Sequence, residues 1–100
     1  MVKILLCCAG GMSTSLLVEH MKDAAAEKGV EAQIWAVGEA NVKNQEAFDI
    51  LLLGPQIRYK LKAFKSEYGD KIPVEMINMR DYGSMNGKAV FDWAMSLLNK

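Results

Sequence analysis

Residues 2–17 read VKILLCCAGGMSTSLL, a stretch that joins a short apolar run, a glycine pair and several hydroxyl side chains. The apolar and partly β-branched residues 2–7 predict a buried strand of a parallel sheet. The glycines at 10–11 predict a turn, and Ser13 and Thr14 supply hydroxyls that can cap the start of a helix. A strand that leads directly into a helix is the first half of a β-α-β unit.

The alternation of strand and helix continues along the chain. The first helix is expected to end at Gly29, and Gly54-Pro55 is typical of a helix start. After the first helix we expect a partly buried strand at 32–37, a polar connection with one or two helical turns at 38–47 and a buried strand at 48–53. A helix follows, with Ile57, Leu61, Phe64 and Tyr68 on one face, and then a strand at 73–77 and an irregular loop at 78–86. The last helix has Val90, Trp93, Ala94 and Leu97 on its inner stripe. This order predicts an α/β fold, a single four-stranded parallel sheet with helices on both faces.

Composition narrows the class of protein. The 100 residues suffice for one domain, and 51% apolar residues predict a real core. Twelve basic and twelve acidic side chains cancel, so a nucleic acid or an anionic membrane surface is not an expected partner. Apolar runs such as 50–53 are far shorter than the roughly 20 residues of a membrane span. We therefore expect a soluble protein without a secretory signal or a membrane-inserted segment.

Cys7 and Cys8 are the two cysteines of the chain. Adjacent cysteines do not make a disulfide framework, and their spacing differs from that of Cys-x-x-Cys redox or zinc motifs. They are expected to be reduced thiols of a cytoplasmic protein, and no residue pattern calls for a metal or another cofactor. Cys7 is interpreted as a small buried residue at a strand end.

Cys8 is interpreted as a nucleophile because a glycine-rich loop and a helix start come directly after it. Unpaired backbone amides and the positive end of a helix dipole favour a thiolate, and they would also hold the oxygens of a phosphoryl group on the sulfur. The expected phosphate-binding residues are Ala9, Gly10, Gly11, Met12, Ser13, Thr14 and Ser15. The loop lacks the patterns G-x-G-x-x-G and G-x-x-x-x-G-K-[ST], so nucleotide binding is weakly supported.

Three loops are expected to meet beyond the carboxyl ends of the strands, at 8–15, 54–59 and 78–84. Gln56, Tyr59 and Tyr82 fall in the two flanking loops and are secondary site candidates. Simpler roles are assigned to the other polar and flexible residues: Arg58 and Arg80 to solvated surface, His20 to the surface of the first helix, Met12, Met79 and Met85 to flexible docking surface, and Met21, Met76 and Met95 to the core.

At these residues the chain resembles the soluble IIB components of the bacterial sugar phosphotransferase system, in the lactose, cellobiose and chitobiose class. The matching blocks are Cys8-x-x-Gly11-Met12-Ser13-Thr14-Ser15-Leu16-Leu17 and Leu52-Leu53-Gly54-Pro55-Gln56-Ile57, with Tyr59 and Tyr82-Gly83. The likeness covers essentially the whole chain, so residues 1–100 are expected to form one IIB domain. It implies a four-stranded parallel sheet similar to the low-molecular-weight phosphatase fold.

The resemblance also implies a role. Cys8 aligns with the cysteine that takes a phosphoryl group from a phosphohistidine on a IIA partner and passes it to a sugar held by a membrane IIC partner. The loop 9–15 aligns with the phosphate-binding loop, with Gly10 beside Gly11 as a departure from the family pattern. Cellobiose, chitobiose, related β-glucosides and lactose all stay open as the sugar, as does the oligomeric state.

Two other functions stay open from the residues. A redox or sensing protein would use the Cys7-Cys8 pair. A low-molecular-weight phosphatase relative would hydrolyse aryl phosphates, although its loop would carry arginine at the position of Thr14. A carrier must hold its phosphoryl group without losing it to water, so a loop without that arginine favours transfer over hydrolysis.

Overall fold

A computed structural model describes residues 1–8 and 12–98 of the chain. Its elements follow in the order β1 (Val2–Cys8), α1 (Met12–Glu27), β2 (Ala32–Gly38), the 3-10 helix η1 (Glu39–Asn44), β3 (Ile50–Leu53), the 3-10 helix η2 (Pro55–Lys60), α2 (Leu61–Tyr68), β4 (Val74–Met76), α3 (Met79–Gly83) and α4 (Gly87–Leu98). The four strands form one parallel sheet in the order β2-β1-β3-β4. The expected α/β fold is confirmed.

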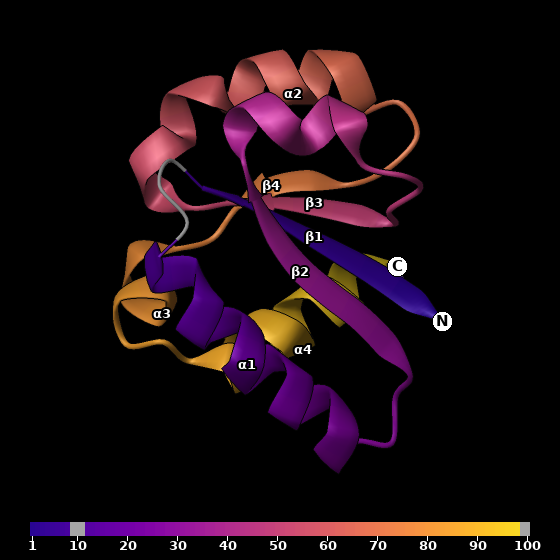
Figure 1. The fold of residues 1–100 in the computed structure, drawn as a ribbon, viewed down its shortest axis with the longest axis vertical. Coiled ribbons are helices and arrows are strands. Elements are labelled where there is room, and N and C mark those ends of the chain that lie inside the picture. Colours follow the sequence, from indigo (N-terminus) through magenta and orange to yellow (C-terminus); the bar gives the residue numbers. More distant parts are fainter. Residues whose placement is uncertain (9–11, 99–100) are drawn as a thin grey trace.

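Helices cover both faces of this sheet (Figure 1). On one face α1 and α4 pack over Ile4 and Leu6 of β1. On the other face, η1, η2 and α2 pack over Leu5 and Cys7, the residues that alternate with them. Successive side chains of a strand point to opposite faces, so β1 contributes to both core layers. Its side chains are fully buried from Ile4 to Cys7, and Cys8 is 2% exposed.

Two expected strands are shorter than their apolar runs. The run 48–53 forms a strand only from Ile50, because Asp49 binds the Lys3 amide through its carboxylate at 2.9 Å and donates its own amide to the Lys3 carbonyl at 2.8 Å. Phe48 instead packs edge-on against Tyr68, with ring centroids 5.6 Å apart. The expected strand 73–77 is shorter in the structure, where β4 comprises Val74–Met76.

The segment 78–86 is not the irregular loop that its glycine suggested. It contains α3, which begins because the Asn78 side-chain oxygen accepts a hydrogen bond from the Asp81 amide at 2.8 Å. The helix after Gly54 also differs from expectation, since it starts as η2 and kinks at Ile57, whose ψ of 31° is not helical. In the ranges 1–8 and 12–98, no helix has the length and apolar character needed to cross a membrane.

Candidate functional site

Cys8 is the last residue of β1 and is 2% exposed. Thr14, in the first turn of α1 and fully buried, donates a hydrogen bond from its hydroxyl Oγ1 to the Cys8 Sγ at 2.8 Å. The Val37 carbonyl of β2 lies 4.0 Å from the same sulfur and can accept the weak thiol donor. The strand end and the helix start therefore meet at this sulfur.

Cys7 lies on the opposite face of β1, within the core layer under α2. Burial raises the pKa of its thiol from 9.0 to about 12, and the negative charges of Cys8 and Glu39 add to the rise while Lys60 opposes it. A buried thiol with such a pKa stays protonated at neutral pH and is a poor nucleophile. The structure thus places the two adjacent cysteines in different chemical environments.

The expected phosphate-binding residues are only partly described. Ala9, Gly10 and Gly11 lie outside the described residues. Met12 and Ser13 form the first residues of α1, followed by the buried Thr14 and the exposed Ser15. Thr14 is a member of this set that contacts the Cys8 sulfur.

The expected flanking loops do meet the carboxyl end of β1. The Gly54 amide donates to the Cys7 carbonyl at 2.8 Å. A Cβ built on Gly54 would lie 3.0 Å from the Gln56 side-chain oxygen and 3.5 Å from ring atom Cε1 of Tyr82. Gln56 and Tyr82 therefore both approach Gly54, which directly follows Leu53, the β3 partner of Cys7.

Beside this point the surface is hollowed by a cavity of about 510 Å³. Its lining comes from η2 and α3 and comprises Pro55, Gln56, Arg58, Tyr59, Met79, Tyr82 and Gly83. Tyr82 is buried at 6% exposure, whereas Tyr59 and Met79 are 69% and 66% exposed. An open, partly apolar hollow with arginine at its rim thus adjoins the strand end that carries Cys8.

Glu39 is a residue of this edge that the sequence analysis did not single out. It follows Gly38, which pairs with Cys8 in the sheet, and its carboxylate accepts from the Tyr59 hydroxyl at 3.3 Å and lies 3.7 Å from the Lys60 ammonium. The negative charge of Glu39 raises the pKa of the Tyr59 hydroxyl. Its place directly after a strand-ending glycine was the available sequence signal.

The remaining assignments are mixed. Arg58 and Arg80 are exposed, as expected. Met21 is fully buried, while Met76 and Met95 are half-buried. Of the three methionines expected on docking surface, Met79 lines the cavity, Met85 is half-buried against the α1 and α4 core, and the Met12 side chain is outside the description.

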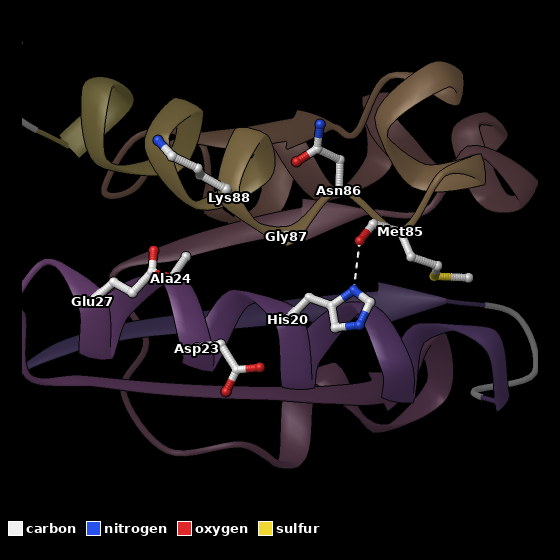
Figure 2. Close-up of a pocket in the computed structure, with 8 residues that line it drawn as sticks. All are labelled: His20, Asp23, Ala24, Glu27, Met85, Asn86, Gly87 and Lys88. Carbon is white, nitrogen blue, oxygen red and sulfur yellow. Dashed lines mark hydrogen bonds between the residues drawn. The ribbon is translucent and has the colours of Figure 1, made fainter.

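His20, expected at the surface of the first helix, lies on α1 and is not fully exposed. It is half-buried and lies in a second hollow, of about 360 Å³, between α1 and the start of α4 (Figure 2). Its ring nitrogen Nδ1 lies 2.7 Å from the backbone carbonyl oxygen of Met85. Among residues 1–8 and 12–98, no group of three His, Cys, Asp or Glu side chains is placed to hold a metal ion.

Comparison with known proteins gives a consistent result. Residues 3–92 match the family model described as PTS system, Lactose/Cellobiose specific IIB subunit. The oligo-beta-mannoside-specific EIIB component of Bacillus subtilis is 46% identical over 98% of this chain and 97% of that protein. The galactose-specific EIIB component of Lactococcus lactis subsp. cremoris is 42% identical over 96% of this chain and 95% of that protein.

Solved structures have the same architecture. The cellobiose-specific IIB component of Borrelia burgdorferi superposes with a TM-score of 0.80 at 40% identity, covering 98% of this chain and 92% of that one. The lactose-specific IIB domain of Streptococcus pneumoniae gives a TM-score of 0.84 at 17% identity, with 96% of each chain covered, and it supports the fold alone. With a family match that spans nearly all of its sheet and helices, the chain belongs to the lactose/cellobiose-specific IIB family of the sugar phosphotransferase system.

Proposed function

We propose that this chain is a cytoplasmic phosphocarrier, which takes a phosphoryl group onto Cys8 from a phosphohistidine of a IIA partner and transfers it to a sugar held by a membrane IIC partner. The observation that carries the proposal is the hydrogen bond from the Thr14 hydroxyl to the Cys8 sulfur at 2.8 Å, at the carboxyl end of β1. A neutral hydroxyl that donates to sulfur favours the thiolate, the form of cysteine that attacks as a nucleophile. Residues 1–100 would act as one IIB domain.

Both transfers balance without a cofactor. In the first, the Cys8 sulfur attacks phosphorus in line, the S–P bond forms, and the P–N bond of the phosphohistidine breaks. The imidazole keeps the electron pair, and the thiol proton goes to the solvent or to that nitrogen. In the second, a sugar hydroxyl oxygen attacks phosphorus, the S–P bond breaks, and the hydroxyl proton is released as the thiolate re-forms.

The loop 9–15 is proposed to bind the phosphoryl oxygens through its amides and hydroxyls, since a helix N-terminus directs unpaired N–H groups at an anion. Thr14 supports transfer over hydrolysis because it supplies a neutral donor at the position where a phosphatase loop carries arginine. A neutral hydroxyl stabilises the negative charge that spreads over the phosphoryl oxygens during attack by water less than a charged arginine would.

Gln56, Tyr59 and Tyr82 are proposed to contact the partners. They line the cavity beside the strand end, and every donor or acceptor of the phosphoryl group must approach the same sulfur. The relatives are named for oligo-β-mannoside, galactose and cellobiose. We therefore place the sugar in the cellobiose, chitobiose and lactose class without choosing among its members.

The redox alternative receives little support from the cysteine environments. A Cys7-Cys8 reaction requires both sulfurs to approach, yet Cys7 lies in the core layer on the opposite face of β1 with a thiol pKa near 12. A phosphocarrier needs only one reactive sulfur, which agrees with this separation.

The test is the intact mass of the protein after incubation with phosphoenolpyruvate, the general phosphotransferase components and a IIA partner. Wild type and Cys7→Ser should each gain one phosphate, and Cys8→Ser should gain none. Since Cys7→Ser changes the neighbouring thiol by the same single atom, it is the matched control. Phosphate on Cys8→Ser, or a lack of phosphate on wild type with several IIA partners, would overturn the proposal.

A further inference from the structure

The contact between His20 and Met85 joins two parts of the chain that are 65 residues apart. Figure 2 shows the His20 ring rising from α1 toward the connection between α3 and α4, with the dashed line ending on the Met85 carbonyl oxygen. A carbonyl oxygen can only accept, so Nδ1 must carry the hydrogen. The geometry therefore assigns neutral His20 to the Nδ1–H tautomer and leaves Nε2 without a hydrogen.

Met85 has an unusual backbone conformation at the other end of this bond. Its φ of 55° lies in the left-handed region, which is unfavourable for a residue with a side chain. Its carbonyl oxygen accepts from the Gly87 amide at 2.9 Å as well as from His20 at 2.7 Å, so both lone pairs are used. A strained residue persists where its surroundings hold it in place, and such residues are concentrated at functional sites.

The backbones of α1 and α4 also touch at His20. A Cβ added to Gly87 would lie 2.4 Å from the carbonyl carbon of His20 and 2.5 Å from the amide nitrogen of Met21. Only glycine permits this approach at the first residue of α4. The His20 side chain thus extends from the point where the two helices cross, and it reaches the turn that precedes α4.

That turn leads directly to the candidate site. Met85 donates its amide to the Tyr82 carbonyl at 3.2 Å, and Tyr82 approaches Gly54 at the end of β3. At the other end of the connection, α1 carries Thr14, the donor to the Cys8 sulfur. His20 therefore links α1, the helix that contacts the nucleophile, to the turn after α3, the helix that forms one wall of the 510 Å³ cavity.

We infer that His20 is a positioning residue, which fixes α3 and its side chains Tyr82 and Met79 for the docking of the phosphorylated donor. The inference rests on the proposed function, because it assigns the α3 wall to donor binding. His20 acts through Met85 and does not touch the reacting atoms. Loss of its hydrogen bond should therefore weaken donor binding and leave the transfer step itself nearly unchanged.

The first test needs no donor protein. In His20→Asn, the amide Nδ2 takes about the place of the ring Nδ1 relative to Cγ, and His20→Leu keeps the bulk but offers no donor. Nitrogen NMR at alkaline pH should show the Nδ1–H tautomer in wild type. Backbone amide signals of residues 79–85 should move in His20→Leu and return toward the wild-type positions in His20→Asn. An Nε2–H tautomer, or equal shifts in both variants, would overturn the inference.

The second test measures steady-state transfer from a phosphorylated IIA partner. His20→Leu should raise the KM for this donor by roughly three- to tenfold, the factor that one uncharged hydrogen bond supplies, with kcat within about twofold. His20→Asn should recover most of the loss. Asp23→Asn, which alters an exposed side chain of the same hollow, is the matched control and should behave as wild type.

A lowered kcat with unchanged KM, or a His20→Asn variant as impaired as His20→Leu, would count against a positioning role. Wild-type protein that accepts no phosphate would instead overturn the proposed function and the kinetic part of this inference together. The tautomer and the amide shifts would still decide whether His20 holds the α3–α4 connection.

Discussion

Thr14 is the side chain whose chemistry can be tested most directly, because its hydroxyl lies 2.8 Å from the Cys8 sulfur. Thr14→Val keeps the shape of the side chain and removes the donor. Hydrogen bonds to charged groups contribute roughly 1.5–3 kcal/mol, so we expect phosphoryl acceptance to slow by about tenfold or more. Thr14→Ser retains the hydroxyl and should stay within a few fold of wild type. Rapid-quench measurement of phosphate gain separates the two, and equal rates would show that the hydroxyl is dispensable.

Cys7 gives a prediction for pH dependence. Its pKa of about 12 in the folded protein exceeds the ordinary 9.0 of an unfolded thiol, so the folded state holds this proton more tightly. The resulting stability is fully present below pH 9 and is lost as the pH rises from about 9 to 12. One proton limits the slope to about 1.4 kcal/mol per pH unit.

We expect the free energy of unfolding of Cys7→Ala to fall less steeply above pH 9 than that of wild type, as measured by urea titration at pH 8, 9 and 10. The variant should be less stable than wild type at pH 8, because it leaves a small cavity in the core layer under α2. The difference between the two slopes cancels the contribution of groups distant from Cys7 and therefore reports on this thiol. Parallel slopes would contradict the assigned pKa.

Gly87 is the residue on which the packing of two helices depends. Gly87→Ala would force its Cβ to within 2.4 Å of α1 backbone at His20, so α4 must move away. Overpacking of this kind costs on the order of 1–3 kcal/mol. Gly83→Ala is the matched control, since a Cβ there meets nothing within 4 Å and alanine suits a helix better by up to about 1 kcal/mol. Urea unfolding of both variants tests this, and similar stabilities would contradict the close packing.

Sequence patterns predicted the longer elements well and the shorter ones poorly. β1 and α1 follow from a buried apolar run and a helical apolar stripe, signals that extend over many residues. The extent of β3 depends on Asp49, whose carboxylate pairs with a residue 46 positions away. α3 depends on a single cap at Asn78, which was present in the sequence but was outweighed by the nearby glycine. Local patterns carry little information about such tertiary contacts.

The residues of the candidate site were likewise predictable only where the signal was local in the sequence. Cys8 and the three converging loops follow from local sequence and from the rule for parallel sheets. The bridge from His20 to Met85 and the contact of Tyr59 with Glu39 join residues 65 and 20 positions apart. A lone histidine on a helix offers no local signal that its partner is a carbonyl from a distant turn, so only the fold could identify it.

At the scale of the whole molecule, the two core layers share one sheet. Leu5 belongs to the layer under α2 and Leu6 to the layer under α1 and α4, and these two residues are neighbours on β1. Neither layer can lose its strand without exposing the other. We therefore expect both layers to unfold in one cooperative transition, as small domains usually do.

The two tryptophans of the chain allow this to be measured, because they lie on opposite faces of the sheet. Trp35 packs against the α2 layer and donates its indole N–H to Gln45 at 2.8 Å, whereas Trp93 packs against the layer of α1 and α4. Trp93→Phe leaves only the first reporter and Trp35→Phe only the second. In each variant the urea midpoint of tryptophan fluorescence should coincide with that of far-UV circular dichroism. Each protein serves as its own control, so any stability change caused by the substitution cancels. In one of the variants, the fluorescence midpoint could fall at a lower urea concentration than the circular dichroism midpoint. That result would show that the layer around the remaining tryptophan unfolds separately, and that β1 couples the two layers less tightly than its burial implies.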